Sequence, residues 1–401
     1  VLDHTVLDES KNNYIMSIFG GKNGYGLSVC DVSTGEFQTT EFPTILAASR
    51  ILDEVARFSP AEVVCNEAFL EHPVAKDLKE RFRIAFSDVD NRMFAYTTAK
   101  DTLEHHFHVS SLDGFGLAKK EIAVSAAGGL LWYLLETQKN DLEHISVLKY
   151  YTIGDFMPLD VASRRNLELT ETMREKNKKG SLLSVLDETK TAMGARTLRK
   201  WVEQPLLSAA EICKRLDAVE ELKNDLFLRE EIKDILRTMF DFERIMGRVV
   251  YQTANARELS MLKNSIENLP LLKRTLGRCK SPYLQEIYEK LDPLENIHDL
   301  IDQAIVEDPP FSVREGGMIK HGYSDELDTY TKAKTEGKAW IEQMEEEERE
   351  KTGIKNLKIR FNKVFGYYLE VTKSNLEDVP ENYIRKQTLA NCERFITPEL
   401  N

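Results

Sequence analysis

Basic and amide side chains gather near the end of the sequence, where Lys358 to Thr372 alternates like a β-strand. From Lys355 to Ile396 there are eight basic and five acidic residues, a local charge of +3. Lysine and arginine attract phosphate because binding releases the counterions around a nucleic acid. Asparagine, glutamine and threonine add hydrogen bonds to phosphate oxygens without reading bases. The stretch indicates a phosphate-contacting surface, and a solvated basic face is the alternative.

Two neighbouring features admit both a functional and a structural interpretation. Phe365, Tyr367 and Tyr368 could stack on bases, but aromatics at every second residue more often form the packed face of a sheet. The acidic run Glu345–Glu350 is interpreted as the solvated end of a helix. We therefore expect the aromatics in a core and the acidic run in solvent.

A metal site is not indicated. Glu104, His105, His106 and His108 have the right side chains, but adjacent histidines point in different directions and no second ligand set is evident. The five cysteines are far apart and include no C-x-x-C pair. No G-x-x-x-x-G-K-[ST] phosphate loop occurs. We expect no catalytic residue, no metal and no cofactor in this chain itself.

The bulk composition describes a soluble, multidomain chain. It has 401 residues and a formal net charge of -13, and this length predicts two or three domains. The apolar run from Ile122 to Leu135 is short and interrupted, which favours a buried helix over a membrane span. The start has no secretory pattern. We expect a cytoplasmic protein with no membrane contact.

The elements change character near residue 150. Asn13 to Phe42 predicts an antiparallel meander, followed by a helix near 46–58 and a buried strand in "AEVVCNE". After Tyr151 the pattern is helical. Ser208 and Glu211 form a capping-box pattern, and Ile212, Leu216, Val219 and Leu222 follow on one helical face. Further helices are expected at 226–240, 241–250, 256–268 and 283–291.

A long helix precedes the basic stretch. Ser324 is its expected N-cap, and Gly353 is its expected stop after Asp325–Thr352. A turn is expected at 362–366, and "YIRKQTLANCERFI" predicts a third strand or a mixed segment. Thr397 and Pro398 read as the start of another helix. The layout predicts two antiparallel arms joined by a β-tip, in a protein larger than this chain.

Three parts of the sequence resemble the MutS family of DNA mismatch-repair proteins. The stretch "SRRNLELTETMREKNKKGSLLSVLDETKTAMGARTLRKWVEQPL", at 163–206, is similar to the family's core domain. "RFNKVFGYYLEVTKSN" and "VPENYIRKQTLANCERFITPEL" are similar to its clamp domain. The N-terminal part resembles its connector domain, and "HTVLDESKNNYI" fits that start. The resemblance covers essentially the whole chain and favours the bacterial mismatch-repair branch.

The resemblance implies a multidomain fold, α/β plus all-α. A ribonuclease-H-like α/β connector would occupy 1–150. A helical core with the start of a long lever helix would span 151–338, and a small antiparallel β clamp 339–396. Residues 397–401 would begin a truncated returning lever helix.

The clamp's contacts with the duplex DNA backbone carry over to matching positions. They are Asn362 and Lys363 in the turn, and Arg385, Lys386, Gln387, Thr388 and Asn391 in "RKQTLAN". The whole protein would be a homodimeric DNA-dependent ATPase that uses ATP and Mg²⁺, recognises mismatches or small loops, becomes a sliding clamp and meets a MutL-like partner through the connector. Phe69 and Glu71 match the spacing of the family's mismatch-reading motif but lie within the connector. We therefore expect this chain alone neither to read a mismatch nor to hydrolyse ATP.

Two other classes remain open from the sequence. A ribonuclease-H-type nuclease would hold Mg²⁺ between paired carboxylates, for which Asp31, Asp88 and Asp90 are the candidates. A structural coiled-arm protein would have no role on DNA. The carboxylates around Asp31 in the fold separate the first class from the mismatch-repair interpretation.

Overall fold

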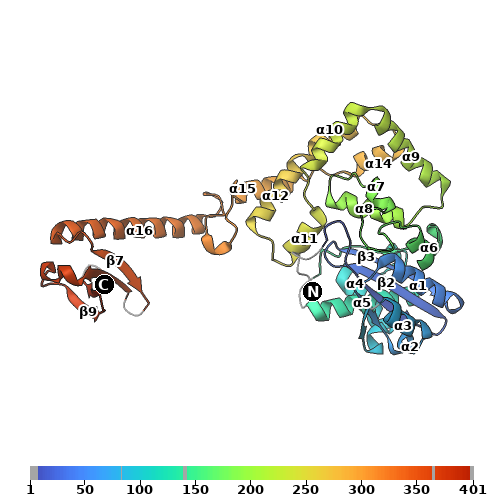
Figure 1. The fold of residues 1–401 in the computed structure, drawn as a ribbon, viewed down its shortest axis with the longest axis horizontal. Coiled ribbons are helices and arrows are strands. Elements are labelled where there is room, and N and C mark those ends of the chain that lie inside the picture. The colour runs from blue at the N-terminus through green and yellow to red at the C-terminus, as the bar shows by residue number, and fades with distance from the viewer. Residues whose placement is uncertain (1–7, 83, 139–141, 364–365, 398–401) are drawn as a thin grey trace. The chain divides into compact units, whose positions relative to one another are not determined.

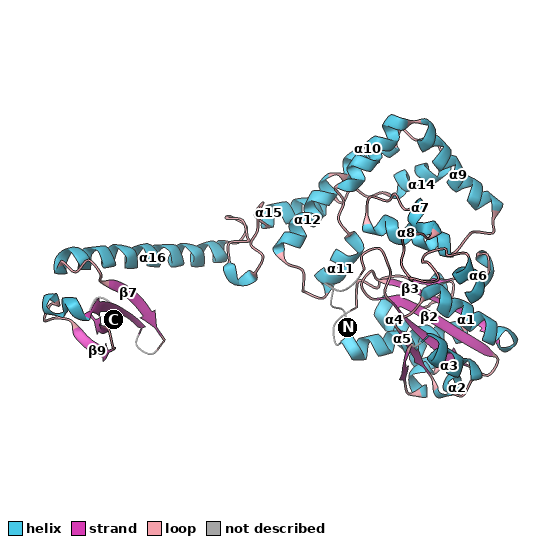
Figure 2. Ribbon diagram, in the orientation of Figure 1, coloured by secondary structure: helices cyan, strands magenta, loops and turns pink. Residues whose placement is uncertain are grey.

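The computed structural model describes residues 8–82, 84–138, 142–363 and 366–397 (Figure 1). The chain divides into two compact units, Val1–Met318 and Ile319–Asn401. The first unit contains an α/β part and a helical part, and the second contains one long helix and a small sheet (Figure 2). This architecture confirms the predicted fold class.

A six-stranded mixed sheet forms the α/β part, in the order β5-β4-β1-β2-β3-β6. Its strands are β1 (Tyr14–Gly20), β2 (Gly24–Asp31), β3 (Glu36–Pro43), β4 (Glu62–Cys65), β5 (Ala85–Asp88) and β6 (Leu148–Tyr150). β1, β2 and β3 pair antiparallel, while β4 is parallel to β1, β5 to β4 and β6 to β3. The predicted meander and ribonuclease-H-like arrangement are present.

Helices cover both faces of this sheet. They are α1 (Ala47–Phe58), α2 (Glu67–Leu70), α3 (Pro73–Asp77), α4 (Tyr96–Phe107) and α5 (Glu121–Gln138). Because side chains alternate along a strand, Leu27 packs in the core with Ile51 of α1, whereas Cys30 packs in the core with Leu130 of α5.

Helix α5 lies against the sheet because β2 has a glycine beneath it. A Cβ at Gly26 would lie 2.3 Å from the carbonyl oxygen of Ile122, so a larger residue would push the helix away. The apolar run Ile122 to Leu135 is thus the central helix of a buried layer. No helix in the described part of the chain is long and apolar enough to cross a membrane.

Ten α-helices follow in the described helical part. They are α6 (Val161–Asn166), α7 (Leu182–Leu186), α8 (Ala192–Glu203), α9 (Ala209–Asn224), α10 (Leu226–Arg237), α11 (Phe242–Val250), α12 (Ala256–Glu267), α13 (Leu269–Leu276), α14 (Pro282–Lys290) and α15 (Glu295–Ala304). Ser208 caps α9 by accepting a hydrogen bond from the Glu211 amide at 3.4 Å, which is one of the two bonds of the predicted capping box.

The predicted apolar face of α9 needs a correction. Ile212, Leu216 and Val219 are 37%, 57% and 59% exposed, respectively, whereas Ala218 is buried and Leu222 is packed beside it. α9 packs on α10 and α14 through that second face. Helical spacing alone does not show which of two apolar stripes meets a neighbour.

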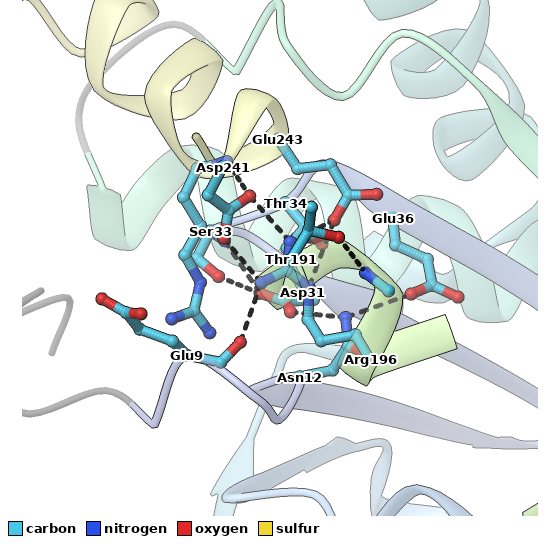
Figure 3. A network of polar contacts seen from close by, with 12 residues as sticks. Glu9, Asn12, Asp31, Ser33, Thr34, Glu36, Thr191, Arg196, Asp241 and Glu243 are labelled. Carbon is cyan, nitrogen blue, oxygen red and sulfur yellow. Dashed lines mark hydrogen bonds and ion pairs between the residues drawn. The ribbon is translucent and has the colours of Figure 1, made fainter. Parts of the chain in front are cut away.

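A network of ion pairs joins the helical part to the segment that leads into β1 (Figure 3). The side chain of Arg196, in α8, is 2% exposed and binds Asp241 in a bidentate pair at 2.7 and 2.8 Å. It also contacts Glu243 at 2.5 Å and donates to the carbonyl oxygen of Glu9 at 2.9 Å. Burial raises the pKa of Asp241, but the hydrogen bonds and charge of Arg196 outweigh burial and lower it.

The second unit begins with a helix whose bounds match the prediction. α16 spans Asp325–Thr352, Ser324 caps it through the Leu327 amide, and Gly353 ends it with a φ of 71°. Its 28 residues give a length of about 42 Å. All residues from 329 to 340 are exposed.

A four-stranded antiparallel sheet follows α16. It contains β7 (Lys358–Asn362), β8 (Gly366–Thr372), β9 (Ile384–Thr388) and β10 (Cys392–Ile396), in the order β7-β8-β10-β9. The segment expected to be a third strand or mixed is therefore a hairpin of two strands. The helix start expected at Thr397 and Pro398 lies at and beyond the end of the described residues.

The Arg196 network generates a stability prediction. We expect Arg196→Met to lower the free energy of unfolding at pH 7 by about 3 kcal/mol, because it removes the bidentate ion-pair partner of the largely buried Asp241. Urea unfolding measures this loss, and Arg174→Met, at an exposed arginine, is the matched control.

The pH dependence of the same variant has a definite sign. The pKa of Asp241 is lower in the folded state than in the unfolded state. Its ionised carboxylate therefore stabilises the fold at pH values above the unfolded pKa of about 3.9. This stabilisation is lost as the pH falls through the folded pKa. The difference in free energy of unfolding between wild type and Arg196→Met should therefore become smaller below about pH 4. An equal difference at pH 7 and pH 3 would contradict this role.

Candidate nucleic-acid interface

The predicted phosphate contacts lie in two separate parts of the small sheet, which we locate by its two ends. Asn362 pairs with Gly366 where β7 meets β8, which we call the inner end. Cys392 pairs with Thr372, and we call this side, with Lys373 and the turn 388–392, the outer end. The six residue steps from Gly366 to Thr372 correspond to about 20 Å.

Helix α16 defines the direction of the two ends. β7 runs back along its last turns, because the Ile359 amide donates to Glu345 Oε2 and Arg349 Nε donates to the carbonyl oxygen of Leu357, both at 2.7 Å. The outer end therefore lies beside the end of the helix at Gly353. The inner end points back toward its start (Figure 1).

The structure brings five of the seven predicted residues together, on β9 and the turn after it. Three of them form hydrogen bonds or an ion pair with side chains of the neighbouring strand β10. Arg385 lies 3.5 Å from Glu393, although its side chain is 63% exposed. Thr388 donates to the same carboxylate at 3.4 Å, and Gln387 accepts a hydrogen bond from Arg394 at 2.9 Å.

Lys386 and Asn391 are the other two members of this group. Both are exposed, and the Asn391 carbonyl oxygen accepts from the Lys373 amide at 3.1 Å, which holds the turn against the end of β8. Asn362 and the exposed Lys363 lie at the inner end. They form a separate predicted contact.

Three lysines near the outer end were counted in the local charge but not selected as contacts. They are Lys355, Lys358 and Lys373, all exposed. No ion pair joins these lysines or Lys386 to a carboxylate that the structure describes. Two features of the sequence could have indicated these lysines. The helix stop at Gly353 places Lys355 in the turn after the helix, and the strand alternation places Lys358 and Lys373 near one end of the hairpin.

The arginines of the sheet are less available for phosphate. Glu370 lies 3.5 Å from Arg360 and 3.4 Å from Arg394. The Arg394 guanidinium also lies 4.6 Å from the centre of the Tyr368 ring. One carboxylate therefore pairs with two arginines, which leaves both guanidinium groups partly engaged within the sheet.

The aromatic prediction is confirmed for Tyr368 and wrong for Tyr367. Phe361 and Tyr367 share a strand face with the buried Leu369 but are 61% and 40% exposed, while Tyr368 is 3% exposed on the opposite face. The two exposed rings pack edge to face at 5.1 Å, beyond the cluster of buried apolar residues beside the end of α16. Phe365 lies outside the described residues.

The acidic run is also only partly solvated. Glu346, Glu347 and Glu350 are exposed, but Glu348 is 7% exposed and Glu345 is half-buried against the sheet. A helix turns 100° per residue, so a run of five carboxylates cannot all face solvent once one side of the helix packs.

Asp31, the central candidate for a nuclease, is fully occupied by donors. It is 0% exposed and accepts from the Ser33 amide and hydroxyl at 2.9 and 2.7 Å, and from Asn12 and the Asn13 amide at 2.8 and 3.1 Å. Among the described residues, no three His, Cys, Asp or Glu side chains are grouped to hold a metal ion.

Other residues considered for a nuclease site, a metal site or mismatch reading have structural roles instead. Hydrogen bonds from Arg92 lower the pKa of Asp90 to about 2. His106 Nε2 lies 2.9 Å from the carbonyl oxygen of Ile145. Phe69 is 0% exposed in the core beneath α1, so its side chain cannot reach a ligand.

Comparisons with known proteins match the chain along most of its length. The family model described as MutS domain II matches residues 13–146, and MutS domain III matches residues 162–389. The DNA mismatch repair protein MutS of Lachnoclostridium phytofermentans is 48% identical over 400 residues, covering 100% of this chain and 43% of the relative. Those of Acetivibrio thermocellus and Ruminiclostridium cellulolyticum are 48% identical over 100% of this chain and 46% of each relative. The chain therefore spans less than half the length of these curated relatives.

The separation of the two ends is testable by a double-mutant cycle in a full-length protein. We expect Lys363→Gln and Lys373→Gln to weaken binding to a DNA duplex independently, because about 20 Å exceeds the Debye length of about 8 Å in physiological salt. The double variant should lose the sum of the two single losses within about 0.5 kcal/mol, measured by fluorescence anisotropy. A larger coupling would contradict the separation.

Proposed function

The chain belongs to the MutS family of DNA mismatch repair proteins, and from that premise we propose that it holds duplex DNA during mismatch repair through phosphate contacts at the outer end of the small sheet. The observation that carries the proposal is a set of exposed lysines there that pair with no carboxylate in the described part of the chain, near Asn391 in the turn between β9 and β10. They are Lys355, Lys358, Lys373 and Lys386.

The physical basis is a local positive field on an acidic chain. The formal charge of -13 makes most of the protein unfavourable for a polyanion, so close contact is confined to places where cations are exposed and unpaired. Ammonium and amide groups bind phosphate oxygens without reading base edges. The contact is therefore non-specific in sequence and strongly dependent on salt.

Helix α16 suits the role of a lever. It is about 42 Å long, and its exposed middle joins a sheet at one end only within the second unit. A rotation of such a helix displaces the outer end by a distance that grows with helix length. ATP-driven changes elsewhere in the protein would reach the DNA contact by this route.

The remaining activity belongs to the whole protein and rests on family membership. We propose a homodimer that recognises mispairs or small loops, uses ATP and Mg²⁺ bound outside this chain, and becomes a sliding clamp. The α/β part, residues 1–150, would be the connector that meets a MutL-like partner. Residues 151–338 would be the core and start of the lever, 339–396 the clamp, and 397–401 the start of a returning lever.

The alternatives lack support. A nuclease of the ribonuclease-H type needs free carboxylates around a metal, but both oxygens of Asp31 accept hydrogen bonds from protein donors. A coiled-arm protein without a DNA role does not account for the family membership or for the unpaired lysines.

Neutralising the outer end tests the proposal in the full-length protein. We expect the triple variant Lys355→Gln, Lys373→Gln and Lys386→Gln to reduce the slope of log K against log salt by up to about 3, since each phosphate contact contributes about 0.9. The loss should be equal on matched and mismatched duplexes, measured by anisotropy titrations at several salt concentrations.

The control is Lys334→Gln, an exposed lysine in the middle of α16, which should leave the slope unchanged. An unchanged slope in the triple variant would refute the phosphate contact. A loss confined to mismatched DNA would refute its non-specific character.

A further inference from the structure

The small sheet is attached to α16 by a compact set of polar contacts that we call the joint. Its members are the side chains of Glu345, Glu348, Arg349 and Tyr383, together with the backbone of residues 357–359. Glu348 and Tyr383 are 7% and 8% exposed, respectively. The burial of the Glu348 carboxylate requires a physical reason, because burial of an unpaired charge is costly.

The first half of the joint holds β7. Glu345 Oε2 accepts the Ile359 amide and Arg349 Nε donates to the Leu357 carbonyl oxygen, both at 2.7 Å. Glu345 and Arg349 also form an ion pair with each other along the helix. Two charged side chains on one helical turn therefore bind the backbone of one edge strand.

The second half holds the opposite edge of the sheet. The Tyr383 hydroxyl donates a hydrogen bond to Glu348 Oε2, and Tyr383 directly precedes β9. Lys351 Nζ lies 2.9 Å from Glu348 Oε1, so both oxygens of the carboxylate have a partner. Because β7 and β9 are the two edge strands, the joint connects the helix to β7 and to the residue that leads into β9.

Apolar packing alone would fix the angle between helix and sheet poorly. The buried apolar cluster beside the end of α16 has six residues, Ile354, Leu357, Leu369, Val371, Tyr383 and Phe395, and none of the six belongs to α16. Hydrophobic contact is non-directional, whereas hydrogen bonds to charged groups are short and directional. The residues of α16 from 329 to 340 are all exposed, so within the second unit they add no restraint.

We propose that Glu348 and Tyr383 are positioning residues for DNA binding: they set the orientation of the sheet on the lever so that the outer-end lysines face the phosphate backbone. The inference rests on the proposed function of the outer end. It assigns a role in DNA binding to two side chains that touch no DNA.

The charge of Glu348 and its position in the joint predict opposite effects of Glu348→Gln on the affinity for DNA. Removing a negative charge near a DNA contact strengthens binding by electrostatics alone. Releasing one edge of the sheet weakens binding, because the lysines then spend less time in the productive arrangement. A loss of affinity on Glu348→Gln therefore cannot come from its charge.

The experiment compares Glu348→Gln and Tyr383→Phe with Glu346→Gln in the full-length protein. Glu346 is exposed on the same helix, and its substitution removes the same charge. We expect Glu346→Gln to bind duplex DNA as tightly as wild type or slightly more tightly. Glu348→Gln and Tyr383→Phe should each weaken binding by about tenfold, mainly through faster dissociation, and the double variant should be no weaker than the weaker single variant.

A second measurement separates loss of orientation from loss of folding. Spin labels at Lys338→Cys on α16 and Glu381→Cys before β9 give a distance distribution that reports the angle between the helix and the sheet. We expect the distribution to broaden in Glu348→Gln while the amides of Leu369 and Val371 keep their protection from hydrogen exchange. Loss of that protection together with DNA binding would make the role purely structural and overturn the inference.

The remaining outcomes distinguish this inference from the proposed function. If the outer-end lysine variants lower the salt slope while Glu348→Gln and Tyr383→Phe match Glu346→Gln, the positioning role is refuted and the DNA contact stands. If the outer-end variants have no effect, the proposed function fails and the positioning role fails with it.

Discussion

The small sheet rests on the last turns of a single helix, and the proposed contact with DNA depends on that attachment. α16 is exposed around its whole circumference from residue 329 to 340, so within the second unit only its last turns can transmit force to the sheet. Charged side chains of that segment bind β7, the residue before it and the residue that precedes β9. The polar joint makes the sheet an extension of the helix, and a movement of the helix becomes a movement of the outer-end lysines.

Elements with strong local signals were predictable from the sequence. Ser324 marks the start of α16 and Gly353 marks its end. Both signals are local, because the serine hydroxyl accepts a hydrogen bond from the first turn and the glycine adopts a positive φ just after the last turn. The meander of β1, β2 and β3 followed from short apolar runs separated by turns. The exposed stripe of Ile212 on α9 could not be predicted, because the choice of buried face depends on helices distant in the sequence.

The candidate site was predictable in composition but not in arrangement. Asn362 and Asn391 belong to one basic stretch in the sequence, yet the pairing of β8 with β10 places them at opposite ends of the sheet. The sequence predicts both Tyr367 and Tyr368 in a core, but Tyr367 is 40% exposed, whereas Arg394 on the neighbouring strand covers the ring of Tyr368. The inward turn of Glu348 requires Tyr383, 35 residues later. Long-range pairing decides each of these outcomes.

Cross-linking tests the central claim, that the outer end touches the DNA backbone, most directly. A photoreactive group attached to a cysteine at position 391 in the full-length protein would report contact at that end, and the same group at exposed Lys334 would report background. The account predicts cross-links to duplex DNA from position 391 that decrease steeply with salt and are equally abundant on matched and mismatched duplexes. Cross-linking from position 391 no stronger than from position 334 would contradict it.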